Sequence, residues 1–147
     1  MTKVMKLAVT GAAVLALAAC ATYKENAPSW MPGSGAMAVK LSGAEEVPPV
    51  NASGSGSGTI RVAEDGAVSG SVTTTGVQGT MAHIHQAGKG QNGPVIIPLT
   101  KSGDTYTVPA GAKLNATQMS ALKAGNLYVN VHTNANKGGE VRGQLQP

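Results

Sequence analysis

The sequence predicts an all-β domain, an antiparallel Greek-key sandwich with one short helix. Short segments of apolar and polar residues alternate with period two from residue 37 to residue 145, and turn-forming residues separate them. The composition agrees, because the 147 residues include no Phe, one Trp and three Tyr. The core must therefore be built from small aliphatic side chains and Met, which suit short strands better than a deep helical core.

About eight short strands are expected from this alternation. They run over residues 37–42, 60–62, 68–72, 81–86, 95–99, 106–108, 127–132 and 141–145. The Gly/Ser repeat Ser53–Gly58 is expected to form a loop or a weak edge, since glycine is a poor strand residue. One helix is expected from Asn115 to Ala124, with Asn115 as its N-cap and Gly125 ending it.

The N-terminal residues 1–19 have the features of an export signal peptide and are not part of the fold. Lys3 and Lys6 form a charged region, and the apolar run Leu7–Ala19 is too short for a permanent membrane span. The run ends in Leu-Ala-Ala followed by Cys20, which resembles the bacterial lipobox. That resemblance implies a lipoprotein in which the Cys20 thiol carries acyl chains such as palmitate. The alternative is an ordinary secretory signal in which the cysteine is there by chance.

Residues 20–36 are expected to form a lipid-anchored linker, because they are polar and rich in turn residues. The domain proper is expected over residues 37–147. Acyl chains on Cys20 would hold the protein stably at a membrane. Ala21 follows the cysteine in place of Asp, which in a Gram-negative cell resembles the default outer-membrane signal. We therefore expect a cell-envelope location, on the outer membrane and facing the periplasm.

Charge and motifs exclude several classes of function. The formal charge of +4 falls to +2 once Lys3 and Lys6 leave with the signal peptide, which is too little to indicate a nucleic-acid partner. Cys20 is the only cysteine, so no disulfide forms within the chain. Glu45 and Glu46 precede Val-Pro-Pro and indicate an extended crossing segment, not an acid/base pair. No nucleophile triad or phosphate-binding loop is present, and no catalytic residue is assigned.

Four blocks of the sequence, in this order, resemble the chordin-type (CHRD) domain. They are LSGAEEVPPV at 41–50, AHIH at 82–85, GNLYVNVHT at 125–133 and GEVRGQL at 139–145. The resemblance runs from about Met37 to Leu145. The family occurs in extracellular regulators of animals and in exported bacterial proteins, and it has no generally established biochemical activity. It implies an immunoglobulin-like or superoxide-dismutase-like β fold and no particular reaction.

All three histidines of the chain lie within two of these blocks. His83 and His85 are two residues apart on a predicted strand, so they project from the same face about 6–7 Å apart at the backbone. His132 is the natural third ligand, and three imidazoles suit copper or zinc. Met81 shares the face of the histidine pair and would add a thioether that favours copper, Cu(I) above all. We expect the ring nitrogens to converge within about 4 Å of one another.

Copper–zinc superoxide dismutase also takes metal ligands from a His-x-His strand pair, which is an analogy of fold. Dismutase chemistry is not expected, because it requires more histidines and a bridging arrangement than three histidines provide. Metal storage, delivery or protection is the function that the histidines favour.

The same residues also allow a purely structural interpretation. The histidines could hydrogen-bond backbone carbonyls and fix a loop, with Asn130 and Thr133 in the same network. The domain would then be a non-catalytic structural or interaction module that binds another envelope component. Glu140 and Arg142 are either hydrogen-bond partners of an imidazole or a surface ion pair, and a structural role is favoured for Arg142.

Overall fold

The structure is a computed structural model that describes residues 35–147. The expected signal peptide 1–19, the lipidation site Cys20 and the linker up to residue 34 lie outside the described residues. Within the described range, no helix has both the length and the apolar character needed to cross a membrane.

Nine strands and one short α-helix make up the described domain, which confirms the all-β class. The strands are β1 (Ala36–Ser42), β2 (Ser55–Val62), β3 (Val68–Thr75), β4 (Gly79–Gln86), β5 (Val95–Pro98), β6 (Thr100–Ser102), β7 (Thr105–Thr107), β8 (Leu127–Thr133) and β9 (Val141–Leu145). A 3₁₀ turn, η1, spans Gly43–Glu45, and helix α1 spans Ala116–Lys123.

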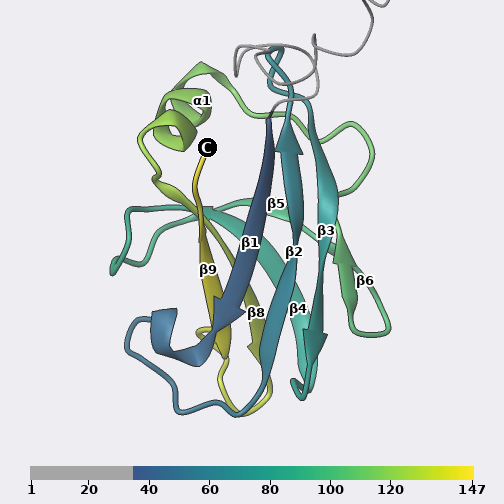
Figure 1. Cartoon of the computed structure of the whole chain (residues 1–147), viewed down its shortest axis with the longest axis vertical. Helices are drawn as coiled ribbons and strands as arrows, with labels where there is room; N and C mark the ends of the chain where they lie inside the picture. Colours follow the sequence, from purple (N-terminus) through teal and green to yellow (C-terminus); the bar gives the residue numbers. More distant parts are fainter. Residues whose placement is uncertain (1–34) are drawn as a thin grey trace, which may run out of the picture.

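All strand pairs are antiparallel and join in one sheet of order β5-β4-β8-β9-β1-β2-β3-β7-β6. The first and last strands meet at one residue pair, Ser42 opposite Arg142. The sheet folds over at this junction, so the half β5-β4-β8-β9 packs against the half β1-β2-β3-β7-β6 (Figure 1). The chain crosses between the halves after β3, β5 and β7, as expected for a sandwich with Greek-key connections.

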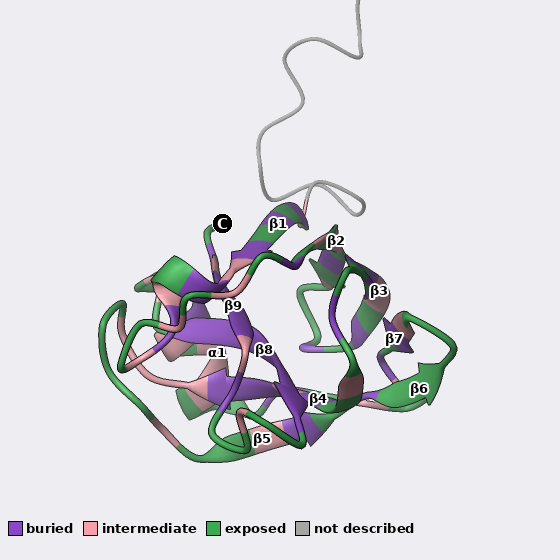
Figure 2. Cartoon of the chain, turned by 90° about the horizontal axis from the view of Figure 1, so that it is seen from below, coloured by how far each residue is buried: buried purple, intermediate pink, exposed green. Residues whose placement is uncertain are grey.

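The predicted alternation is confirmed in the strands that form the core. In β1, Met37, Val39 and Leu41 are buried while Lys40 is exposed. The core between the two halves is aliphatic, and Tyr106 is the one aromatic residue within it among the described residues. Strand β8 departs from this alternation, because it is buried along its whole length (Figure 2).

The expectation for the Gly/Ser repeat is wrong, since Ser55–Gly58 forms part of β2, between β1 and β3. The serines face solvent, and the glycines take the inward positions of the alternation. A β-carbon at Gly58 would collide with the backbone of Ser71 and Val72 on β3. Glycine weakens an isolated strand, so the sequence favours a loop here. In the folded domain, pairing with a strand on each side supports the backbone.

The predicted helix is confirmed with its cap. The Asn115 side chain accepts a hydrogen bond from the Gln118 backbone, and the Gln118 side chain accepts one from the Asn115 backbone, both at 2.9 Å. This reciprocal pair satisfies two amides at the start of α1. Gly125 ends the helix with φ +71°, a conformation that glycine adopts without steric cost.

The substitution Gly143→Ala should destabilise the protein by about 2 kcal/mol, as overpacking of a tight contact typically does. Gly143 faces inward on β9, and a β-carbon there would collide with the Lys40 carbonyl where β9 crosses β1. Urea unfolding measures the loss. Gly138→Ala is the matched control, because a β-carbon at Gly138 meets no atom within 4 Å. Equal unfolding midpoints for the two variants would show that the strand crossing does not need glycine.

Candidate metal centre

A layer of polar side chains covers the face of β4, β8 and β9 that points away from the aliphatic core. It consists of His83, His85, Tyr128, Asn130, His132, Arg142 and Gln144, and we call it the polar layer. Loop segments cover it, because polar layer residues hydrogen-bond to the loops 87–93 and 137–138. Most of these side chains are therefore buried although they lie outside the aliphatic core.

The pairing of β4 with β8 brings the three histidines together. His85 lies opposite Tyr128, and His83 lies opposite Asn130, so His132 is the diagonal neighbour of His83. One potential ligand atom from each histidine lies within 4.8 Å of the other two. The closest pair, Nδ1 of His83 and Nε2 of His132, is 3.0 Å apart. The three ligand atoms are therefore spread slightly more widely than the expected distance of about 4 Å.

Backbone carbonyls determine which nitrogen is free in two of the rings. Nδ1 of His85 donates to the Gly93 carbonyl at 2.9 Å, and Nδ1 of His132 donates to the Lys137 carbonyl at 2.8 Å. A carbonyl only accepts, so Nδ1 carries the proton in both rings and Nε2 carries a lone pair. The Nε2 atom of His85 is buried and has no hydrogen-bond partner in the described part of the chain.

His83 completes the cluster by donating from Nδ1 to the lone pair on Nε2 of His132. Their separation of 3.0 Å is close to the distance of about 3.3 Å between nitrogens bound 2.0–2.1 Å from a tetrahedral ion. An ion can replace this hydrogen bond if the His83 proton moves to the other ring nitrogen.

Met81 lies beside the histidine cluster at the surface. It is opposite His132 in the β4–β8 pairing, and 50% of it is exposed. The pairing puts Met81 on the strand face of the histidines, next to a candidate ligand residue. Its role as a thioether ligand stays a prediction.

His85, Tyr128 and Arg142 form a stacked column of three side chains. The rings of His85 and Tyr128 are nearly parallel, at 7°, with centroids 4.8 Å apart. The Arg142 guanidinium carbon lies 3.4 Å from the centre of the Tyr128 ring, in a cation–π contact. Because β8 runs between β4 and β9, His85 and Arg142 lie on opposite faces of Tyr128. Arg142 also donates to the Gly88 carbonyl at 3.2 Å.

One family comparison covers almost the whole described domain. The family model of the CHRD domain matches residues 37–145. The chain belongs to the CHRD domain family. No curated protein and no solved structure matches the chain. All of the polar layer lies inside the matched range, so the histidine cluster is a part of this CHRD domain and not of an addition to it.

The interpretation of Glu140 and Arg142 as a surface ion pair is wrong for this CHRD domain. Arg142 is only 1% exposed, and its partners are a carbonyl, an amide oxygen and an aromatic ring. The Glu140 carboxylate instead accepts hydrogen bonds from Thr133 at 2.7 Å and Asn136 at 3.3 Å. Glu140 thus stabilises the loop that follows His132, and the structural role favoured for Arg142 is confirmed.

His83 and His85 favour the neutral form. Burial, together with the neighbouring His132 and His85, lowers the pKa of His83 to about 4. The pKa of His85 is also lowered, again mainly by burial. Neutral imidazole is the form that binds a metal ion, so at neutral pH these two rings need not lose a bound proton to do so.

Glu46 is a buried acid at the edge of the polar layer, where the sequence had indicated only an extended segment. Burial raises the pKa of its carboxyl, and the charge of Arg142 partly opposes that shift. No local pattern reveals this burial. The place of Tyr128 in the polar layer could have been predicted from the sequence. Tyr128 and His132 are on the same face in the alternation of their strand.

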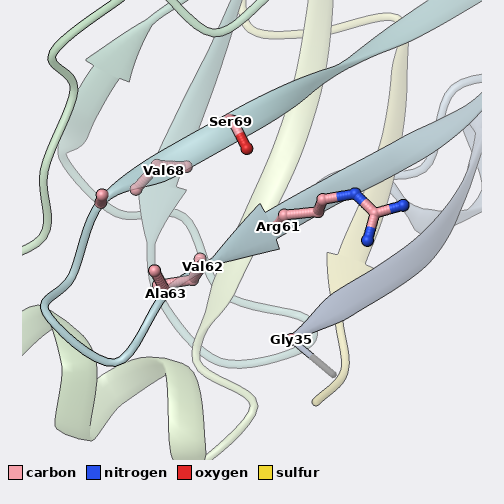
Figure 3. A pocket seen from close by; sticks show the side chains of 7 residues that line it. Gly35, Arg61, Val62, Ala63, Val68 and Ser69 are labelled. Carbon is pink, nitrogen blue, oxygen red and sulfur yellow. The ribbon is translucent and has the colours of Figure 1, made fainter. Parts of the chain in front are cut away.

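Two surface hollows lie on the other half of the sheet. One, of about 220 Å³, is lined by residues near the start of β1 and the β2–β3 turn, among them Gly35, Arg61 and Val68 (Figure 3). The other is a shallow groove over β1, β2 and β3. No residue of the polar layer lines either hollow, so neither is part of the histidine cluster.

The metal-free protein should lose stability when it is acidified from about pH 6.5 to about pH 4. The pKa of His83 is about 4 in the folded protein and near 6.5 in the unfolded chain, so within this window protons bind preferentially to the unfolded chain. The free energy of unfolding therefore falls as the pH falls. Urea unfolding at about pH 7 and about pH 5 measures the loss, which should be smaller in His83→Gln. Equal losses in both proteins would contradict this assignment.

Proposed function

We propose that this CHRD domain binds one copper ion, with zinc as the alternative, through His83, His85 and His132. Its task would be storage, delivery or protection of the metal outside the cytoplasm. The observation that carries the proposal is the approach of three potential ligand atoms to within 4.8 Å of one another. Imidazole ligands suit copper and zinc, whereas magnesium and calcium require oxygen ligands.

The hydrogen bonds of the rings favour binding over a purely structural role. Loop fixation accounts for the Nδ1 atoms of His85 and His132, which donate to Gly93 and Lys137. It leaves Nε2 of His85 buried and without a hydrogen-bond donor among the described residues, which is an unfavourable state for a polar atom. A metal ion would satisfy that lone pair. The carbonyl bonds would then orient two ligands, as the outer partners of metal-bound histidines commonly do.

The N-terminal sequence supports a place for this site in the cell envelope. We propose that Cys20 is lipidated after removal of residues 1–19, and that the anchor holds the domain at the outer membrane, facing the periplasm. A site for copper or zinc in that position would meet incoming metal before it reaches the cytoplasm.

A second function is favoured by the groove over β1, β2 and β3. Small hydroxyl side chains and one cation line it, including Ser55, Ser57, Thr73, Thr75 and Lys40. These side chains are exposed and offer hydrogen bonds over a flat strand surface. Such a surface suits a polar envelope component as partner, and it lies on a different half of the sheet from the histidines.

The purified protein should bind one copper or zinc ion, and the triple variant His83→Ala, His85→Ala and His132→Ala should lose this binding. We expect more than about a 100-fold loss of affinity, because removing even a hydrogen-bond partner of a ligand typically costs about 10- to 100-fold. Titrations with Zn(II), Cu(II) and Cu(I) measure it. Lys113→Ala, which removes an exposed cation paired with Asp65 outside the polar layer, is the control and should bind as the unmodified protein does. Unchanged affinity in the triple variant would exclude this site.

The substitution Met81→Leu should weaken Cu(I) binding by about tenfold and leave Zn(II) binding unchanged. A thioether is a soft ligand that favours Cu(I), and leucine keeps the volume without the sulfur. Competition with a Cu(I) chelator and a separate Zn(II) titration give the two affinities. A parallel loss for both ions would mean that Met81 acts through the fold and not as a ligand.

A further inference from the structure

We infer that the buried guanidinium of Arg142 biases the three-histidine site toward Cu(I) over Cu(II). The inference rests on the proposed copper site and adds the oxidation state that the site prefers. It follows from the stacked column His85–Tyr128–Arg142, which places a fixed positive charge one aromatic ring away from a candidate ligand.

The charge of Arg142 is shielded from water. The residue is 1% exposed, and Tyr128, which separates it from His85, is 2% exposed. A charge that solvent does not reach acts on its surroundings at a lower effective dielectric constant than a surface charge does. The field of the guanidinium is therefore felt across the polar layer, and the site lies within it.

No carboxylate forms an ion pair with Arg142 within the described residues. The ion pairs found there join Lys89 to Glu45 and Lys113 to Asp65. Arg142 donates to the Gly88 carbonyl and the Asn92 amide oxygen, which carry no formal charge. The acid that interacts with Arg142 is Glu46, but its carboxyl does not come within ion-pair distance of the guanidinium. The guanidinium thus has no carboxylate in contact with it among the described residues.

Electrostatic repulsion distinguishes the two copper ions. Neutral imidazoles add no charge, so the site becomes +1 with Cu(I) and +2 with Cu(II). A nearby positive charge repels the divalent ion twice as strongly as the monovalent one. At an effective dielectric constant of about 20, one buried unit charge at this range changes the ratio of the two affinities by roughly tenfold. Zn(II) should respond as Cu(II) does, because it carries the same charge.

Arg142 also has a positioning role that must be separated from its charge. By donating to Gly88 and Asn92 it fixes the loop that presents the Gly93 carbonyl to His85. Loss of this support would weaken the binding of every ion to a similar extent. The ratio of Cu(II) to Cu(I) affinity is therefore the measurement that a merely structural role would not change.

The test compares Cu(I), Cu(II) and Zn(II) affinities of the full protein and its Arg142→Gln and Arg142→Lys variants, with circular dichroism to check folding. Arg142→Gln should raise the ratio of Cu(II) to Cu(I) affinity about tenfold, with Zn(II) following Cu(II). Arg142→Lys keeps the charge and should keep the ratio. Arg61→Gln, which removes an exposed cation from β2 in the other half of the sheet, is the control and should not change the ratio.

Asn92→Asp tests the same charge without removing a buried side chain. Asn92 is exposed, and its amide oxygen lies 3.4 Å from the Arg142 guanidinium, so an added negative charge there offsets the cation. This variant should also raise the ratio of Cu(II) to Cu(I) affinity. An unchanged ratio in folded Asn92→Asp and Arg142→Gln would overturn the inference. Absence of copper and zinc binding by the unmodified protein would instead overturn the proposed function.

Discussion

Strand β8 is buried on both faces, and this constraint determines the organisation of the rest of the domain. Its inward residues Leu127, Val129 and Val131 complete the aliphatic core. Its outward residues Tyr128, Asn130 and His132 are polar and are also buried. Buried polar groups need hydrogen-bond partners, so the surrounding loops must present backbone groups to them. The Lys137 and Gly138 carbonyls meet this need from the loop that follows β8 itself.

The same constraint explains several features of the loops. The amide of Gly93 donates to the Tyr128 hydroxyl while its carbonyl accepts from His85, so one residue fixes two side chains of the polar layer. Gly139 has φ +135°, and a β-carbon there would collide with the side chains of Glu46 and Asn130. Glycine at that position lets the loop lie directly on the buried acid. The loops are therefore part of the candidate site and not only its cover.

Local geometry explains what could be predicted from the sequence. His83 and His85 share a face because side chains of a strand alternate, which requires no knowledge of the partner strand. The capped helix could likewise be predicted from residues that are close together in the sequence. The stacking of His85 on Tyr128 depends instead on the register of two strands far apart in the chain, and that register is set by packing of the whole domain. The burial of Arg142 also depends on the packing of the whole domain, so the sequence alone left a buried hydrogen-bonding role and a surface ion pair as alternatives.

Features of the polar layer that are unfavourable for stability converge on one place. Three imidazoles share a single hydrogen bond among themselves, and one buried nitrogen of His85 has no partner in the described residues. Arg142 is buried and forms no ion pair with a carboxylate in residues 35–147. An aliphatic layer of similar volume would avoid these costs, as replacements of buried charged groups by apolar ones often do. Unfavourable local arrangements that persist in a folded protein are commonly found at functional sites. A ligand that accepts lone pairs and carries little positive charge would relieve the orphaned nitrogen and tolerate the neighbouring cation, and Cu(I) has both properties.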